Sequence, residues 1–127
     1  MGWFYTGFDF LNRKNGYFKI GESGEKYLST RLAQIRHYDA FECLGFLKLI
    51  NDTKSERLYV ESYVRMMMER EEGLTHVQND HFAYTIRKGE KHTQAQEYAD
   101  KALTYAKAAC AFAGIEYVEG YKKYKRR

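Results

Sequence analysis

Four side chains of this sequence have types suited to chemistry on an anionic substrate. Lys19 and Arg31 are the two cations that stand out in the stretch Tyr17–Arg36, which reads YFKIGESGEKYLSTRLAQIR. Tyr5 supplies a phenol before this stretch, and Glu61 supplies a carboxylate after it. Cationic side chains bind phosphate groups, and carboxylates bind hard divalent metals. The elements that carry these residues decide whether Lys19 and Arg31 meet a phosphate or only solvent.

A β-hairpin is predicted at the start of the chain. Residues Trp3–Leu11 are rich in aromatic side chains, and the polar run that follows them ends in Asn15 and Gly16. Asn-Gly is a hairpin signal because both residues tolerate positive φ. The first strand should therefore pair antiparallel with Tyr17–Gly21.

Alternation along these two strands places Tyr5 and Lys19 on the same side of the hairpin. Successive side chains of a strand point to opposite faces of a sheet. One face collects the residues that suit a core, namely Phe4, Phe8, Phe10, Phe18 and Ile20. If that face is buried, the phenol of Tyr5 and the ammonium of Lys19 are presented together on the other face.

Arg31 belongs to an amphipathic helix that is predicted from about Lys26 to His37. Apolar residues recur there at helical spacing and form a buried stripe of Leu28, Leu32 and Ile35. Arg31 lies on the flank of this stripe, where an arginine can bind an anion or simply cover apolar surface with its methylene groups. His37, near the end of the helix, is explained most simply by an interaction with the helix dipole.

A third strand and a second helix are predicted to follow. Phe41–Ile50 is largely apolar, as expected of a central strand. Thr53 and Glu56 fit a capping box at the start of a helix that runs to about Glu72. The capping box gives Glu56 a structural role, whereas Glu61 in the same helix has none.

Two interpretations of Glu61 follow from its neighbours. Arg57 and Arg65 lie four residues before and after it. Glu61 could therefore take part in two exposed ion pairs, worth about 0.2–0.5 kcal/mol each. It could instead be a metal-binding carboxylate at the edge of the core. The residues alone leave both interpretations open.

A further strand and a long helix are predicted in the last third of the chain. Thr75–Ile86 should be strand-like after Asn79 and Asp80. Thr93–Gln96 fits a second capping box, which would open an alanine-rich helix that Gly114 ends. The small side chains of this helix allow close packing on the domain or, in a homodimer, on a second copy of the chain.

The C-terminal tail interleaves aromatic and basic groups. It reads YKKYKRR, and its cations are Lys122, Lys123, Lys125, Arg126 and Arg127. Such a tail can contact phosphates and stack on bases. A solvated, frayed terminus is equally consistent with the sequence.

Composition bounds the remaining possibilities. The 127 residues are predicted to form one domain, with a core over residues 1–90 and a C-terminal helix and tail over residues 91–127 packed on it. The formal charge of +4 permits a nucleic-acid partner without requiring one. Cys43 and Cys110 are expected to be reduced core thiols of a cytoplasmic protein. No apolar run is long enough to span a membrane, so no membrane partner is expected.

Several motifs together resemble the GIY-YIG nuclease family. They are Gly2–Tyr5 (GWFY), Tyr17–Gly21 (YFKIG), Arg31 followed by Leu32 and Ile35, and Glu61 in a later helix. The resemblance is greatest to a phage-associated branch in which KIG replaces YIG, and Asp80-His81-Phe82 resembles the acidic-aromatic-Phe element of that branch. It covers Gly2–Phe82 and implies an α+β fold. The family sheet is small, three-stranded and antiparallel with flanking helices, which the periodicities also predict, and the long C-terminal helix is added to it.

The resemblance implies hydrolysis of DNA phosphodiesters with one divalent metal. Tyr5 would orient or deprotonate the attacking water, and Lys19 would support the nucleophile or the scissile phosphate. Arg31 would bind that phosphate and stabilise the charge that grows in the transition state. Glu61 would hold Mg²⁺ or Mn²⁺, which also neutralises the leaving oxygen. The sequence leaves open whether Asn79 or His37 joins this site.

Two other functions are compatible with the same residues. One is a catalytically inactive protein of this fold that binds DNA or a protein partner. The other is an unrelated α/β interaction module, in which Lys19, Arg31 and Glu61 are ordinary surface charges. Convergence of the four residues in one pocket would separate the first two functions from the third.

Overall fold

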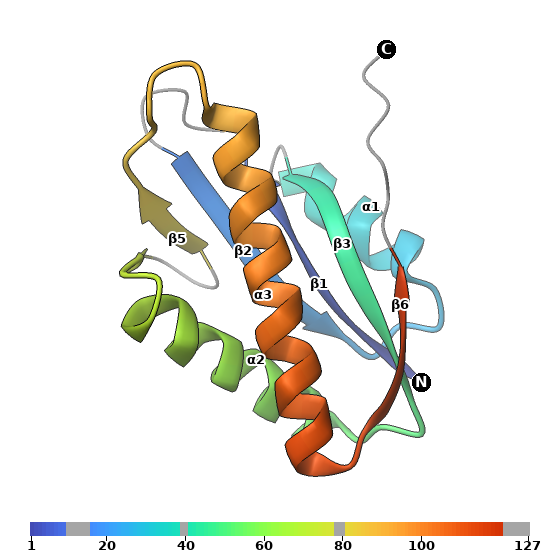
Figure 1. The fold of residues 1–127 in the computed structure, drawn as a ribbon. Coiled ribbons are helices and arrows are strands. Elements are labelled where there is room, and N and C mark those ends of the chain that lie inside the picture. The colour runs from blue at the N-terminus through green and yellow to red at the C-terminus, as the bar shows by residue number, and fades with distance from the viewer. Residues whose placement is uncertain (10–15, 39–40, 78–80, 121–127) are drawn as a thin grey trace.

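The computed structural model describes residues 1–9, 16–38, 41–77 and 81–120. In chain order its elements are β1 (Gly2–Asp9), β2 (Gly16–Ser23), α1 (Leu28–Tyr38), β3 (Phe41–Ile50), α2 (Lys54–Arg70), β4 (Thr75–His76), β5 (His81–Tyr84), α3 (Lys91–Ala113) and β6 (Glu116–Gly120). The strands form one antiparallel sheet in the order β4-β5-β2-β1-β3-β6. Helices α2 and α3 cover one face of this sheet, and α1 covers part of the other (Figure 1).

The α+β class of the fold is confirmed, but the predicted three-stranded sheet is wrong. The strands β2, β1 and β3 form the centre of a six-stranded sheet. The added strands are short: β4 has two residues, β5 has four and β6 has five. Such segments hold too few alternating side chains to be recognised by periodicity. β5 and β6 are strands because they pair with the open edges of the central three, and β4 pairs in turn with β5.

The hairpin of β1 and β2 is antiparallel, as predicted, with Tyr5 opposite Gly21. The residues expected in the core are buried where the structure describes them: Phe4, Phe8, Phe18 and Ile20. The predicted Asn-Gly turn and Phe10 lie outside the described residues. At Tyr5 the opposite face is not open to solvent, because α1 packs there and Tyr5 is completely buried.

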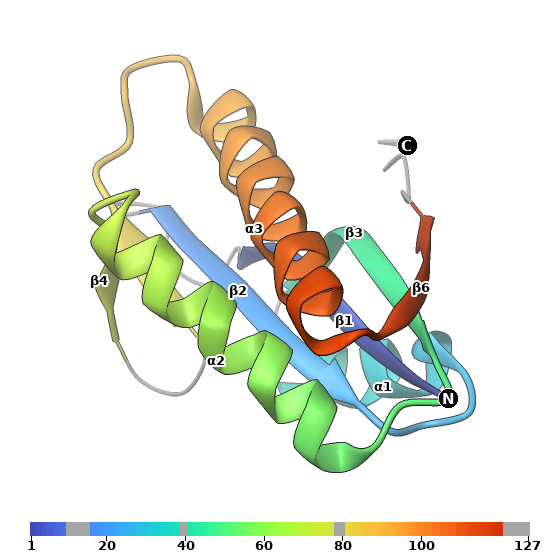
Figure 2. The same ribbon diagram turned by 60° about the horizontal axis from the view of Figure 1, so that its bottom comes forward.

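The first helix buries the stripe that the sequence predicts. It begins at Leu28 and runs to Tyr38, slightly later than expected. Its apolar side chains are Leu28, Leu32 and Ile35, all buried. They pack with Tyr5, Phe41 and Cys43 in a small core of their own. Helix α1 lies on the side of the sheet opposite α2 and α3 (Figure 2). The helix is therefore the element that brings Arg31 over the sheet.

A β-bulge in β3 changes which side chains face α1. Along the pairing with β1, Thr6 lies opposite Gly45 and Gly7 lies opposite Cys43, so Leu44 has no counterpart. The extra residue shifts the alternation by one position. As a result Cys43, before the bulge, and Phe46, after it, both face α1.

The two predicted capping boxes had different outcomes. The first is present: Thr53 and Glu56 cap α2 reciprocally, through bonds of 3.1 and 2.9 Å. The second prediction is wrong, because α3 begins at Lys91 and Thr93 lies inside its first turn. Gly114 ends α3 in the left-handed conformation, with φ of 69°, as predicted. Within the described part of the chain, no helix is long and apolar enough to cross a membrane.

A partly buried carboxylate joins the end of α2 to α3. Glu72 forms an ion pair with Lys101 and accepts a hydrogen bond of 2.6 Å from the hydroxyl of Tyr105. Burial opposes the charged form of Glu72, but these two donors outweigh it and hold the pKa of Glu72 below its usual value. Burial and the same carboxylate raise the pKa of Tyr105 to about 12.

Replacing Glu72 by glutamine is expected to lower the free energy of unfolding at neutral pH. It should also make this free energy depend less on pH in the acid range. A carboxyl with a lowered pKa in the folded state stabilises the fold above its unfolded pKa, and this contribution is lost as pH falls through the folded value. Because Lys101 is half-exposed, we expect a loss of about 1–2 kcal/mol at pH 7, and a smaller difference from wild type below about pH 4. Urea unfolding at several pH values measures it. Glu71→Gln, at an exposed position next to it, should change neither quantity.

Candidate functional site

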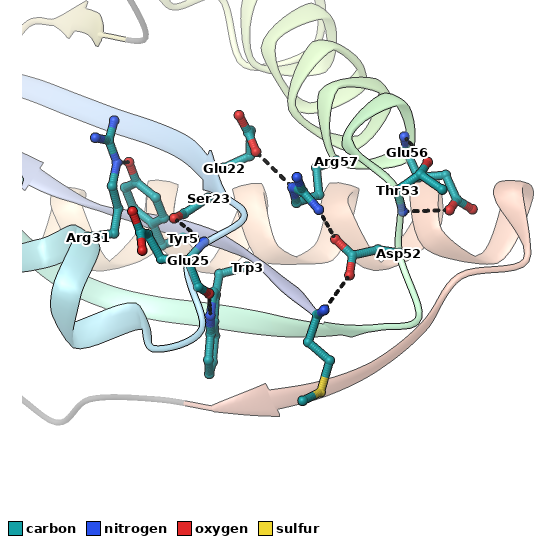
Figure 3. A network of polar contacts seen from close by, with 11 residues as sticks. Trp3, Tyr5, Glu22, Ser23, Glu25, Arg31, Asp52, Thr53, Glu56 and Arg57 are labelled. Atoms are coloured by element: carbon teal, nitrogen blue, oxygen red, sulfur yellow. Dashed lines mark hydrogen bonds and ion pairs between the residues drawn. The ribbon is translucent and has the colours of Figure 1, made fainter.

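Arg31 and Tyr5 are brought together by α1 and β1. The Nε of Arg31 donates a hydrogen bond of 3.3 Å to the phenol oxygen of Tyr5 (Figure 3). The Nη1 of Arg31 also lies 3.4 Å from the side-chain oxygen of Gln34 on the same helix. Two side chains that the sequence separates by 26 residues thus meet at one point of the sheet. The predicted neighbour of Tyr5 was Lys19, so this contact with Arg31 was not foreseen.

Gly21 allows the phenol of Tyr5 to occupy this position. A Cβ atom at Gly21 would lie 2.4 Å from both the Cζ and the hydroxyl oxygen of Tyr5. Tyr5 and Gly21 are directly opposite each other on β1 and β2. The ring of Tyr5 therefore lies across β2, in space that any side chain at position 21 would fill. The presence of glycine at position 21, the last residue of the KIG sequence, is therefore explained by the close approach of Tyr5.

Lys19 lies on the same face of the sheet as Tyr5. It is opposite Gly7, and Gly7 and Tyr5 alternate to the same face of β1. On its other side Lys19 is opposite His81 of β5. The residue is 8% exposed. The predicted placement of Tyr5 and Lys19 on one face therefore holds, but neither residue is presented on an open surface.

Glu61 is buried on α2, and neither simple interpretation of it describes the structure fully. It is 8% exposed, and its Oε1 accepts a hydrogen bond of 2.8 Å from Arg65. The second predicted partner, Arg57, instead binds Glu22 at 3.0 Å and Asp52 at 2.7 Å. Of the two predicted ion pairs, the one with Arg65 is therefore present and the one with Arg57 is not, and Glu61 is buried where an exposed position was predicted. Glu61 belongs to the helix that packs on the face opposite α1, whereas the other three candidates lie on the α1 side.

The edge of β2 separates Glu61 from the other candidate residues. β5 pairs with Gly16–Lys19 of β2, and in the described residues Ile20–Ser23 have no strand on that side. α2 packs against β2. In the described residues the second half of β2 thus forms an edge of the sheet, and its Glu22 contacts Arg57 of α2.

A pocket of about 440 Å³ adjoins this part of β2. Its lining residues are Glu22, Ser23, Gly24, Glu25, Arg31 and Gln34. The pocket gives Arg31 access to a ligand from solvent. Arg57 offsets the negative charge of Glu22, so Arg31 faces a smaller opposing charge than the composition of the lining suggests. The pocket forms where a strand, a turn and a helix meet, so no local sequence signal predicts it.

The donor set suits a weakly held hard cation more than a resident metal. Among the described residues, no group of three or more His, Cys, Asp or Glu side chains is placed to hold a metal ion. Mg²⁺ is commonly bound by one or two carboxylates, water molecules and the phosphate of a substrate. Glu61 is a carboxylate of this kind. A metal at Glu61 would therefore depend on the substrate for further ligands.

Several predicted site residues lie outside what the structure describes. They are Asn79, the side chain of His37, and the tail cations Lys122, Lys123, Lys125, Arg126 and Arg127.

Comparison of the chain with models of protein families, with curated proteins and with solved structures found no match. A functional argument must therefore start from the residues and their geometry.

Proposed function

We propose that this protein is a metal-dependent DNA endonuclease of the GIY-YIG type. The observation that carries the proposal is the hydrogen bond from Arg31 to Tyr5 on a sheet face that also holds Lys19. These three residues come from three different elements, and they are three of the four side chains that the resemblance implies. Glu61, the fourth, belongs to the helix that packs on the opposite face of the sheet, so the predicted convergence in one pocket is only partial.

The order of the elements also supports the proposal. The resemblance implies two strands, a helix, a third strand and a second helix around an antiparallel sheet. The chain has β1, β2, α1, β3 and α2 in this order, and β2, β1 and β3 are neighbours in the sheet. Gly21 adds a third argument, because the tyrosine of the first motif needs the glycine of the second.

The geometry suggests how a phosphodiester would be held. A phosphate in the pocket meets the guanidinium of Arg31, which Tyr5 and Gln34 hold in position. A guanidinium that is fixed before the reaction stabilises the charge of the transition state without reorganising. Tyr5 is fully buried and does not line the pocket, so in this arrangement its hydroxyl positions the guanidinium of Arg31 and does not contact a water molecule itself. Lys19 contributes positive charge on the same face.

Glu61 would hold the divalent metal at the edge of β2. Bound there, Mg²⁺ or Mn²⁺ would supply a Lewis acid for the leaving oxygen. The oxygen of Glu61 that Arg65 contacts is Oε1, so binding of the metal would have to compete with Arg65 or use the second oxygen. Arg65 also explains how a buried carboxylate can remain charged in the absence of a metal.

Plasmid nicking with Glu61→Gln tests this function. We expect the wild type to nick supercoiled DNA with Mg²⁺ or Mn²⁺ and to be inactive with EDTA. Glutamine keeps the shape of Glu61 and a hydrogen bond to Arg65 but removes the metal-binding charge, so the nicking rate should fall by at least about 100-fold. Glu69→Gln, at an exposed position on the same helix, should nick like the wild type. Nicking that survives Glu61→Gln would contradict the assignment.

A second function is favoured by the ion pair of Glu61 with Arg65. In a protein that has lost catalysis, this pair would replace the metal, and the fold would only bind DNA or a protein. The same experiment separates the two. If neither metal supports nicking and DNA binding is salt-sensitive, the protein is a binding module.

A further inference from the structure

Three side chains form an aromatic and cationic surface on the α1 side of the sheet. They are Trp3 of β1 and Phe46 and Lys48 of β3, and we call them the stacking platform. The rings of Trp3 and Phe46 are 5.7 Å apart and nearly perpendicular. The Nζ of Lys48 lies over the Trp3 ring, 5.7 Å from its centroid. All three residues are half-buried, so each keeps part of its surface in solvent.

The platform begins where the pocket of Arg31 ends. The indole nitrogen of Trp3 donates a hydrogen bond of 2.9 Å to the backbone oxygen of Glu25, which lines that pocket (Figure 3). This bond fixes the orientation of the indole. On the sheet, Phe46 is directly opposite Tyr5, and Lys48 is directly opposite Trp3. The platform is therefore continuous with the Tyr5–Arg31 pair.

The far side of the platform is bordered by β6. A Cβ atom at Gly120 would lie 2.3 Å from the ring of Phe46, so this ring lies against the backbone of β6. Val118, opposite Lys48, is 58% exposed. Beyond Gly120 the sequence continues as YKKYKRR, with five cations in seven residues. The chain that starts beside Phe46 is thus strongly basic.

We propose that the stacking platform binds unpaired nucleotides of the DNA strand next to the phosphate held by Arg31. Aromatic faces with nearby cations bind single strands, because every base can stack and every nucleotide brings a phosphate. A base within a duplex already stacks on its neighbours and cannot use the platform. The inference rests on the proposed nuclease function and narrows its substrate to DNA with an unpaired segment, such as a flap or an overhang.

Trp3 is the sole tryptophan of the chain, and this makes binding directly visible. We expect short oligo(dT) to quench the tryptophan fluorescence to saturation, and a blunt duplex of the same length to quench it much less. The titration is done in EDTA, so it does not depend on cleavage. The same oligonucleotide with a fluorescein label gives the affinity of variants by anisotropy.

Two variants and a matched control locate the contact. Trp3→Ala should weaken oligo(dT) binding about tenfold, as loss of one stacked base does, whereas Trp3→Phe should keep most of the affinity. Lys48→Gln should reduce the slope of log K against log salt by about 0.7, the value for one phosphate of a single strand. Lys88→Gln makes the same charge change after β5, near the other edge of the sheet, and should leave the slope unchanged.

The outcomes separate this inference from the nuclease function. Plasmid nicking without any response of Trp3 to oligo(dT) would overturn the platform and leave the nuclease intact. Quenching of Trp3 by oligo(dT) without plasmid nicking would overturn the nuclease function and leave the platform intact. Fluorescence that changes with protein concentration but not with DNA would assign the platform to a second copy. Fluorescence that changes only when residues 121–127 are deleted would assign it to the tail. Either assignment overturns the proposal.

Discussion

Arg31→Ala is expected to lower the rate of plasmid nicking by about 100- to 1,000-fold, the usual loss when one preorganised donor to the transition state is removed. Two roles are lost together. The substrate phosphate loses its guanidinium in the pocket, and the hydroxyl of Tyr5 loses the donor that holds it at 3.3 Å. The initial rate on supercoiled plasmid at saturating Mg²⁺ measures the effect.

Arg31→Lys tests whether the contact with Tyr5 matters beyond the charge. Lysine keeps the positive charge, but a single ammonium cannot reproduce the planar array of donors that faces Tyr5, Gln34 and the pocket. We therefore expect Arg31→Lys to recover little of the activity. Arg70→Lys, an exposed change at the end of α2, is the matched control and should nick normally. Full activity of Arg31→Lys would show that geometry at Tyr5 is not required.

Arg57→Met is expected to lower the free energy of unfolding by about 3–5 kcal/mol. Arg57 is the shared partner of Glu22 on β2 and of Asp52 before α2, and the side chain of Asp52 is fully buried (Figure 3). Burial opposes the charge of Arg57, but its two hydrogen-bonded carboxylates outweigh burial and raise its pKa. Methionine fills similar space and leaves a buried carboxylate without its main counter-charge. Urea unfolding at neutral pH measures the loss.

A double variant and a surface control show whether the buried charge is the cause. Adding Asp52→Asn to Arg57→Met removes the stranded charge and should restore part of the stability. Arg87→Met also breaks two ion pairs, with Glu90 and Glu97, but these residues are about half-exposed. It should lower the free energy of unfolding far less than Arg57→Met does, because solvent screens these pairs. Equal losses for Arg57→Met and Arg87→Met would mean that burial at Asp52 is unimportant.

The structural features that were predicted correctly are those that depend on local sequence signals. The antiparallel hairpin, the Thr53–Glu56 capping box and the buried stripe of α1 each depend on residues that are close in sequence. The face shared by Tyr5 and Lys19 also followed, because alternation along a paired strand needs only the register.

The errors concern contacts between distant segments. Arg57 was assigned to Glu61 on its own helix, but it binds Glu22, 35 residues away. Thr93 fits a helix cap, yet tertiary packing uses Gln94, which accepts a hydrogen bond from the backbone of Arg87 and donates one to that of Thr85. The helix therefore starts earlier than its capping signal indicates.

The candidate site shows the same division. Its residue types could be named from the sequence, but the bond between Arg31 and Tyr5 depends on how α1 crosses the sheet. The stacking platform could not be predicted, because Trp3, Phe46 and Lys48 meet only through the pairing of β1 with β3. The clearest sequence signal for it was a single tryptophan two residues before Tyr5.

The bulge at Leu44 shifts the alternation of side chains along β3 by one residue. Before it, Phe41 and Cys43 are in the frame that supports α1 and Tyr5. After it, Phe46 and Lys48 occupy even-numbered positions, yet they face the same α1 side of the sheet as Phe41 and Cys43. If Leu44 were paired like its neighbours, regular alternation would place one of these pairs on the opposite face of the sheet. Phe41 and Cys43 thus share the α1 side with Phe46 and Lys48 because β3 leaves this one residue out of the ladder.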